Sequence, residues 1–193
     1  MVDDHGIAPD VAAYNARITY KSTSGTVEEV RELIRVMREV AGLRPDVLTY
    51  NALIRALVRH GRVDEALEVY RRLEKGEEEA EVAPDYRTYT WVVGALCRAG
   101  RWSEAEDVFY EGVKRRKVGD LGTVRTLVQG LKDAGKGRAA RRVVVGLRKK
   151  FPDQFDGPWK ELEEIVGVSA SGKEGEEEEE EGYEQPAATT ATA

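Results

Sequence analysis

Residues 45–73 read "PDVLTYNALIRALVRHGRVDEALEVYRRL", and residues 84–109 read "PDYRTYTWVVGALCRAGRWSEAEDVF". Both stretches open with Pro-Asp, continue through an apolar run that ends at Gly-Arg, and then begin a second apolar run. In the first stretch the apolar residues recur at steps of three and four, which is the spacing of one face of an α-helix. Each stretch therefore predicts two short antiparallel helices, and the chain contains this unit more than once.

The same landmarks recur along most of the chain. The intervals of 36, 39 and 35 residues separate four glycines, Gly25, Gly61, Gly100 and Gly135, and also the row Tyr14, Tyr50, Tyr89 and Val124. A constant period of this length indicates stacked helix pairs. We expect frames at 11–46, 47–85 (lengthened by an acidic loop), 86–120 and, in degenerate form, 121–153. We expect residues 1–10 to be the tail of an incomplete preceding repeat, 154–167 a C-terminal capping helix, and 168–193 a disordered acidic tail.

Two local signals support this division. Each landmark glycine is expected to end the first helix of its frame in a left-handed C-cap, where a residue without Cβ is favoured. Each Pro-Asp pair is expected to stop the second helix of the preceding frame. Since a single helix pair cannot bury its apolar face alone, successive pairs must stack. The predicted fold class is all-α, a right-handed superhelical solenoid of antiparallel helix pairs.

Composition excludes several classes of protein. Cys97 is the single cysteine, so the chain has no internal disulfide and too few thiols for a zinc or iron–sulfur site. No apolar run approaches the roughly 20 residues that a membrane helix needs. No nucleophile pattern, phosphate loop or cofactor motif is present. We expect a protein that is not an enzyme, with no catalytic residues, metal, cofactor, membrane association or small-molecule substrate.

The net charge of −6 is unevenly distributed. Residues 169–193 hold eight glutamates and one lysine, so residues 1–168 sum to about +1. Between Lys114 and Lys150 there are thirteen Lys and Arg against two Asp. Such a basic segment favours a polyanionic partner, although a solvated helix face is the plainer interpretation.

The stretch "GLRPDVLTYNALIRALVRHGRVDEALEVYRRLEKG", residues 42–76, resembles a pentatricopeptide repeat of the pure, non-editing class found mostly in plant organelles. The resemblance covers Gly6 to about Pro152. Tetratricopeptide repeats have a similar period, but the Tyr-Asn start of the first helix and the Pro-Asp at the frame end favour the pentatricopeptide family. More faintly, "LRKKFPDQFDGPWKELEEIVG" resembles the C-terminal end of pentatricopeptide proteins associated with the mitochondrial ribosomal small subunit.

What this resemblance implies is single-stranded RNA read at one base per repeat by two side chains. The implied base-reading pairs are Asn15 with Asp46, Asn51 with Asp85, and Thr90 with Asp120. By the family's code, Asn with Asp prefers uracil and Thr with Asp prefers guanine, which spells 5′-UUG. The plainer alternatives are that the asparagines are first-turn polar residues and that the aspartates are helix N-caps; cap and reader are compatible.

The resemblance also implies residues that hold the RNA without reading it. Base clamping falls to Ala12, Leu48 and Arg87, of which Leu48 is the expected apolar wedge and Arg87 could stack on a base. In the fourth frame the equivalent reading position is Arg125, which together with the basic segment is expected to contact phosphates: Lys114, Arg115, Arg116, Lys117 and Arg125.

Two functional hypotheses follow. In the first, the chain binds single-stranded RNA with a sequence preference and acts in organellar RNA metabolism or translation. In the second, it is a structural or protein-binding component, for example of the mitochondrial ribosome, with vestigial reading residues. The family's habit favours the mitochondrion, with the chloroplast as the alternative.

Overall fold

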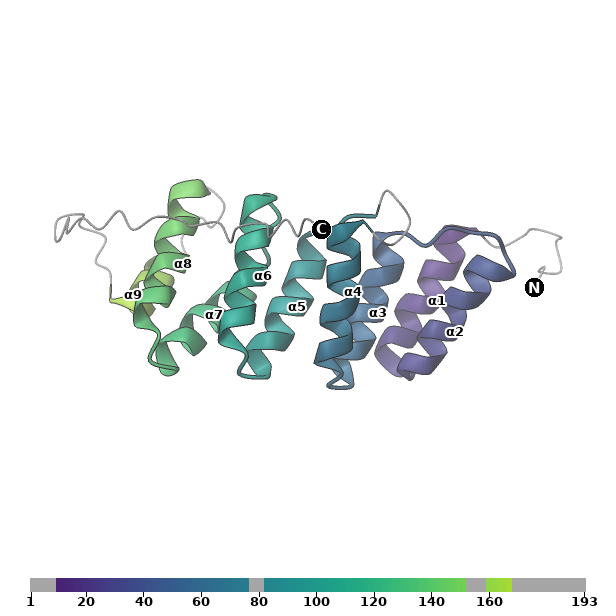
Figure 1. The fold of residues 1–193 in the computed structure, drawn as a ribbon, viewed down its shortest axis with the longest axis horizontal. Helices are drawn as coiled ribbons and strands as arrows, with labels where there is room; N and C mark the ends of the chain where they lie inside the picture. Colours follow the sequence, from purple (N-terminus) through teal and green to yellow (C-terminus); the bar gives the residue numbers. More distant parts are fainter. Residues whose placement is uncertain (1–9, 77–81, 152–158, 168–193) are drawn as a thin grey trace, which may run out of the picture.

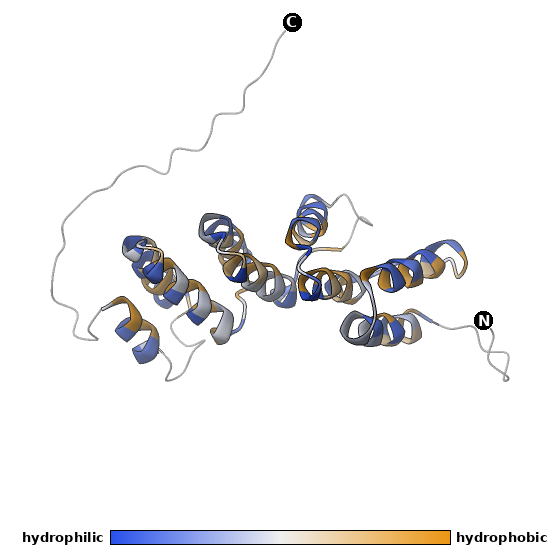
Figure 2. Cartoon of the chain, turned by 90° about the horizontal axis from the view of Figure 1, so that it is seen from below, coloured by the Kyte–Doolittle hydropathy of each residue, from blue (hydrophilic) through white to orange (hydrophobic). Residues whose placement is uncertain are grey.

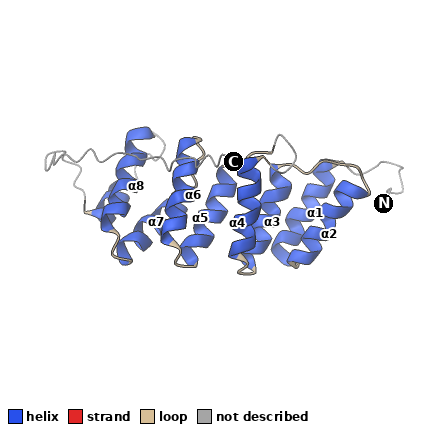
Figure 3. Ribbon diagram, in the orientation of Figure 1, coloured by secondary structure: helices blue, strands red, loops and turns tan. Residues whose placement is uncertain are grey.

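The computed structural model describes residues 10–76, 82–151 and 159–167, and in these ranges every regular element is an α-helix (Figure 3). The expected tail at 1–9, the start of the expected capping helix and the acidic tail lie outside the described residues. The helices are α1 Val11–Ser24, α2 Val27–Glu39, α3 Val47–Arg59, α4 Val63–Lys75, α5 Tyr86–Arg98, α6 Trp102–Lys114, α7 Leu121–Asp133, α8 Gly137–Lys150 and α9 Trp159–Val166.

The helices form two layers (Figure 1). Helices α1, α3, α5, α7 and α9 contact one another in sequence and form the layer that we call the inner layer. Helices α2, α4, α6 and α8 form the outer layer, in which each helix packs against its own partner and against the next inner helix rather than against the next outer helix. Because the inner helices are the more closely spaced, they lie on the concave side of the stack. The predicted all-α solenoid is confirmed.

The core runs continuously between the layers. Figure 2 shows hydrophobic residues on the helix sides that face neighbouring helices, with hydrophilic residues outside. The landmark row is fully enclosed: Tyr14, Tyr50, Tyr89 and Val124 are all buried, and so are Val30, Ala66, Ala105 and Ala140 on the outer helices. Small residues at this second row let the helices of one pair approach closely.

The turns within the pairs follow the glycine prediction in three frames of four. Gly61, Gly100 and Gly135 have φ between 70° and 75°, the left-handed region that favours glycine. Gly25 is different, with φ −107°, and the prediction was wrong there. Its follower Thr26 donates its backbone N–H to Glu29 Oε2 in a capping box, whereas Arg62 in the next frame donates to the Leu57 carbonyl and so closes a left-handed turn.

Ion pairs connect successive frames along the outer layer. Arg62 donates to Glu28 and Glu65, and Arg101 donates to Glu104 and, one frame back, to Asp64. The Arg62 hydrogen bonds lower the pKa of the Glu28 and Glu65 carboxyls. These pairs are exposed, so water screens them and each adds little to stability. Their structural effect is to occupy the acidic side chains of the outer layer.

Close packing governs the C-terminal end of the stack. A Cβ built on Gly130 of α7 would lie 2.0 Å from the Trp102 ring, so glycine is required for that ring to lie flat on α7. Helix α9 then packs on α7 and α8. Its Leu162 is fully buried, and the nearly buried Glu163 accepts a hydrogen bond from Arg148. The closing helix is therefore held by apolar packing and by ion pairs, the second of which joins Glu161 to Arg125 of α7.

Candidate functional site

The positions implied as base readers occupy one edge of the inner layer. Asn15, Asn51 and Thr90 lie in the first half of α1, α3 and α5, and Asp46, Asp85 and Asp120 are the N-caps of α3, α5 and α7. Each aspartate therefore begins the inner helix that follows its reading partner. The loop that leads into α3 runs along the upper edge of Figure 1. The structure brings the first two pairs into direct contact across the junction between frames.

Asn15, Asp46 and Thr49 form the first junction triad. The Asn15 amide Nδ2 donates to both carboxylate oxygens of Asp46, each at 3.0 Å. The Thr49 hydroxyl donates to Asn15 Oδ1 at 2.6 Å. Asp46 also caps α3, accepting the Thr49 backbone N–H at 2.9 Å. One carboxylate thus serves the helix start and the reading residue together, so the cap and reader interpretations of Asp46 coexist.

Asn51, Asp85 and Thr88 form the second junction triad with the same chemistry. Asn51 Nδ2 donates to Asp85 Oδ1 at 2.9 Å, and the Thr88 hydroxyl donates to Asn51 Oδ1 at 2.7 Å. An asparagine amide has two N–H donors and two acceptor lone pairs. The triad uses one of each, so Asn51 retains one donor and one acceptor. Only 5% of Asn51 and 8% of Asn15 is exposed, so both amides are nearly enclosed by the stack.

The third junction is built differently. Thr90 Oγ1 donates to the Tyr86 carbonyl of its own helix at 3.0 Å and accepts the Asp120 backbone N–H at 3.3 Å. The Asp120 carboxylate caps α7 through Thr123 and makes no hydrogen bond to the Thr90 side chain. The hydroxyl proton of Thr90 is thus committed within α5, which leaves its oxygen available as an acceptor.

The three implied clamping residues are all exposed, and only two could cover a base. Ala12 offers a single methyl group, whereas Leu48 is 44% exposed on the first turn of α3. The Arg87 guanidinium lies 5.7 Å from the centre of the Tyr86 ring and donates to its hydroxyl. Because Tyr86 is itself half exposed, Arg87 and Tyr86 form one flat surface at the start of α5.

The implied phosphate contacts have mostly internal partners. Lys114 pairs with Glu111 and Arg115 with Glu74, and the Arg116 guanidinium lies over the Phe151 ring. Arg125, the expected contact of the fourth frame, pairs with Glu161 of α9. Lys117 is exposed in the loop that leads to Asp120. Four members of the group therefore lie at or just after the end of α6, and only Arg125 lies on an inner helix, α7.

Charge divides between the layers, a feature that the sequence analysis missed. The inner helices α1, α3, α5 and α7 contain eight Lys or Arg and one acid, Asp133. The outer helices α2, α4 and α6 contain twelve acids and seven Lys or Arg. Assigning charges helix by helix, rather than along the linear sequence, would have revealed this division. From α1 to α7 the inner helices are therefore the cationic ones, whereas the short inner helix α9 has three Glu and one Lys.

The contacts of the inner cations preserve their charge. The Arg55 guanidinium lies 5.5 Å from the centre of the half-buried Trp91 ring, and Arg59 donates to the Gly25 backbone carbonyl. Neither partner is a carboxylate, so the positive charge is not neutralised in these contacts. Lys21 and Arg125 differ, since they pair with Glu29 of α2 and Glu161 of α9. Outer helix α8 also stands apart, with six Lys or Arg and no acid.

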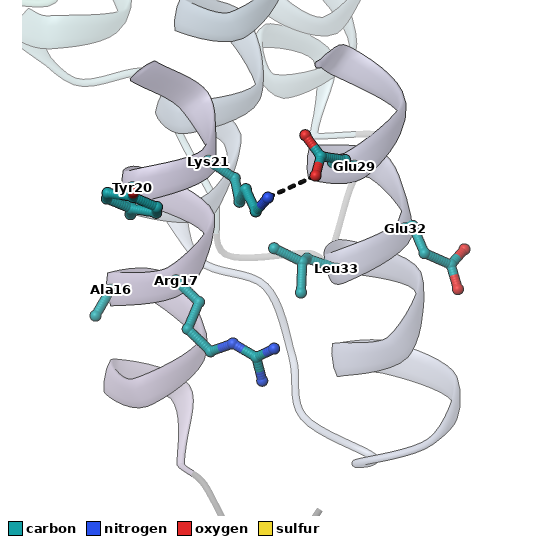
Figure 4. Close-up of a pocket in the computed structure, with 7 residues that line it drawn as sticks. All are labelled: Ala16, Arg17, Tyr20, Lys21, Glu29, Glu32 and Leu33. Atoms are coloured by element: carbon teal, nitrogen blue, oxygen red, sulfur yellow. Dashed lines mark hydrogen bonds and ion pairs between the residues drawn. The ribbon is translucent and has the colours of Figure 1, made fainter. Parts of the chain in front are cut away.

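A cleft of about 520 Å³ opens at the N-terminal end of the stack (Figure 4). Ala16, Arg17, Tyr20 and Lys21 line it from α1, and Glu29, Glu32 and Leu33 line it from α2. One frame later the positions of Arg17 and Lys21 are the buried Leu53 and Leu57. This end face therefore carries charges where the next frame has core, and none of the reader positions lines the cleft.

Other chemistry is not supported by the described residues. Burial raises the pKa of the Cys97 thiol to about 11, which removes it as a nucleophile at neutral pH. The part of the chain that the structure describes holds no group of three His, Cys, Asp or Glu side chains placed to bind a metal ion. None of its helices combines the length and apolarity that crossing a membrane requires.

Comparison with known proteins finds a family match over two of the frames. The family model described as "PPR repeat", the pentatricopeptide repeat, matches residues 41–74 and 80–111. These two segments contain α3, α5 and most of α4 and α6, and both residues of the second reading pair, Asn51 and Asp85, fall within them. No curated protein matches the chain significantly.

Solved structures share the fold. The pentatricopeptide repeat protein PPR10 from maize, solved in complex with an 18-nucleotide psaJ RNA element, is 23% identical with a TM-score of 0.62 over 86% of this chain. The chain spans only 23% of PPR10. The PPR domain of Arabidopsis thaliana protein-only RNase P 1, solved with tRNA, is 16% identical with a TM-score of 0.65, covering 84% of this chain and 83% of the domain.

Proposed function

We propose, from the premise that this chain is a pentatricopeptide repeat protein, that it binds single-stranded RNA along its inner layer. The observation that carries the proposal is the division of charge, with eight cations against one acid on the inner helices α1, α3, α5 and α7. Cations on one surface attract the phosphate backbone and release its counterions, which supplies affinity without sequence preference. PPR10 and the RNase P domain, both solved with RNA, share the fold.

Base preference would come from the junction triads. Asn51 retains one N–H donor and one acceptor lone pair, and the Watson–Crick edge of uracil offers one carbonyl acceptor and one N–H donor side by side. Thr90 retains an acceptor oxygen that a guanine N–H could reach. We therefore retain the predicted preference for a 5′-UUG core, one base per repeat, read by the first three frames.

We propose no catalytic role. RNase P relatives share the repeat fold, but the candidate surface of this chain combines amides, hydroxyls and cations rather than a cluster of metal-binding carboxylates. The protein would act by binding RNA without cleaving it. A mitochondrial site of action, or a chloroplast one, is a proposal from family habit, and the location of a fluorescent fusion of the full-length protein tests it.

A second function is favoured by one observation. In both triads the asparagine is hydrogen-bonded to the following frame, so these residues stabilise the stack even without RNA. A structural or protein-binding component, such as a part of the mitochondrial ribosomal small subunit, would need no more than this.

Fluorescence anisotropy with labelled 12-nucleotide RNAs separates the two functions. The wild-type protein should prefer a UUG-containing strand over an adenine-only strand. Substituting two inner cations, Arg55→Gln with Arg59→Gln, should weaken binding to both strands and reduce the slope of log K against log salt by about 1.4. The matched control substitutes two outer arginines, Arg31→Gln with Arg71→Gln, and should leave the slope unchanged. Equal effects of the two double variants would contradict binding on the inner layer.

A further inference from the structure

Two buried threonines contact the reading asparagines and are not part of the implied reading pairs. Thr49 and Thr88 are fully buried, and the nearest acceptor of each hydroxyl proton is the asparagine Oδ1 of the preceding frame, at 2.6 Å and 2.7 Å. The cap carboxylates of Asp46 and Asp85 are longer alternatives, at 3.0 Å and 3.1 Å. In both cases the asparagine Nδ2 faces the aspartate that precedes the threonine by three residues. Both polar atoms of the amide are therefore hydrogen-bonded, the oxygen to a hydroxyl donor and the nitrogen to a carboxylate acceptor.

The orientation of this amide bears on which pyrimidine it can read. An asparagine side chain has an acceptor on one branch and a donor on the other, and a half-turn exchanges them. Uracil and cytosine present opposite patterns at the same edge: uracil has a carbonyl acceptor and an N–H donor, where cytosine has an amino donor and a ring-nitrogen acceptor. An amide that turns freely could therefore pair with either base, whereas an amide held in one orientation distinguishes them.

We infer that Thr49 and Thr88 are specificity-determining positioning residues, which hold Asn15 and Asn51 in the one amide orientation that favours uracil over cytosine. The inference rests on the proposed function. The aspartate repels a flipped amide, because Oδ1 would then face a carboxylate. The threonine supplies the second constraint. In the observed orientation its hydroxyl donates a hydrogen bond to the asparagine Oδ1 while the asparagine Nδ2 donates to the aspartate, and a flipped amide would lose this arrangement.

The third junction provides an internal contrast. Thr123 occupies the position of Thr49 and Thr88, and its backbone N–H donates to the Asp120 cap as theirs do to Asp46 and Asp85. Its hydroxyl lies 3.4 Å from the Asp120 carboxylate, and the Asp120 backbone N–H donates to Thr90 instead of to Thr123. It makes no hydrogen bond to the reading residue Thr90, whose hydroxyl donates within its own helix. Thr123 therefore keeps the capping role of this position and lacks the positioning role.

The test uses the full-length chain and three 12-nucleotide RNAs that differ only in the core: UUG, CUG and UCG. Thr49→Val removes the hydroxyl at the first triad with little change of shape, and Thr88→Val does so at the second. Thr49→Val should lower the preference for UUG over CUG by about fivefold, the worth of one buried hydrogen bond, without altering the preference for UUG over UCG. Thr88→Val should have the reverse pattern.

Two further variants separate positioning from stability. Thr123→Val should lower the melting temperature, as the other two valine variants do, and leave both preferences unchanged. Thr49→Ser restores the hydroxyl and should restore the preference for UUG over CUG. A general loss of folding would weaken the binding of all three RNAs together. It could not produce a change of preference confined to one base.

The outcomes are distinguishable. If the wild-type protein binds UUG, CUG and UCG equally, the proposed base reading is wrong, and the role of the threonines falls with it. If the wild-type protein prefers UUG but Thr49→Val and Thr88→Val retain both preferences, the base reading stands and the inference about the threonines is overturned.

Discussion

The Asp85→Ala substitution would show whether the junction triads stabilise the stack. Asp85 Oδ1 accepts the backbone N–H groups of Arg87 and Thr88, and in this way caps α5. It also accepts a hydrogen bond from Nδ2 of Asn51 in the preceding frame. Alanine removes both functions at once, one within α5 and one between two frames.

The expected cost follows from these contacts. Loss of an aspartate N-cap costs about 1 kcal/mol of stability. Loss of its partner leaves the Asn51 amide, which is 5% exposed, with a buried donor that has lost its acceptor, at a further cost of about 1–3 kcal/mol. Asp85→Ala should therefore lower the free energy of unfolding by about 2–4 kcal/mol. Asp120→Ala is the matched control and should cost about 1 kcal/mol, since the Asp120 carboxylate caps α7 but makes no hydrogen bond to Thr90.

Urea denaturation followed by circular dichroism at 222 nm measures the difference, and a double-mutant cycle assigns it. If the inter-frame hydrogen bond matters, Asp85→Ala and Asn51→Ala will be non-additive, with a coupling of about 1 kcal/mol or more. Equal destabilisation by Asp85→Ala and Asp120→Ala, together with additivity in the cycle, would refute the reasoning that the triad connects the frames.

Three further predictions concern packing and charge. Gly130→Ala, which in an open helix would gain about 1 kcal/mol, should instead destabilise the protein by about 1–3 kcal/mol because the methyl group meets the Trp102 ring; thermal melts should show this penalty reduced in a Trp102→Ala background. Arg148→Ala should cost about 2 kcal/mol in urea denaturation, since it leaves the buried Glu163 carboxylate unpaired, and Arg148→Lys should recover part of the loss. Burial raises the pKa of Cys97 to about 11 from 9.0, so its contribution to stability is complete below pH 9 and is lost as pH rises through 11; Ellman's reagent at pH 8 should detect one thiol in denatured protein and almost none in folded protein.

Local patterns were sufficient for the helix pairs. The step of three and four in the apolar residues predicts the faces that pack, and Gly-Arg marks where an inner helix has ended. The expectation that Pro-Asp stops the preceding outer helix was wrong, because α2 and α4 end at Glu39 and Lys75, well before the prolines, and the aspartate of each pair instead caps the next inner helix. The exception at Gly25 depends on Glu29, a side chain four residues away that takes the backbone N–H needed for a left-handed turn. A competition of this kind between caps is visible only when both helices are in place.

The sequence predicted the reading pairs of the candidate site but not the threonines that contact them. The resemblance to pentatricopeptide repeats identifies the pairs that begin with Asn15 and Asn51, and the structure places each asparagine against its aspartate. The resemblance could not show that Thr49 and Thr88 complete the contact, because each threonine lies more than thirty residues along the chain from the asparagine that it touches.

The sequence by itself determined the repeated helix pair, because period, capping and apolar spacing are properties of neighbours along the chain. Only the tertiary structure decided what the pairs present to a ligand. Stacking sorts the helices into an inner layer rich in cations and an outer layer whose acids pair with arginines of adjacent frames, and it brings together polar groups from successive frames. The physical reason is that electrostatic attraction and hydrogen bonding depend on distance in space, which for these groups is set by the packing of one frame on the next.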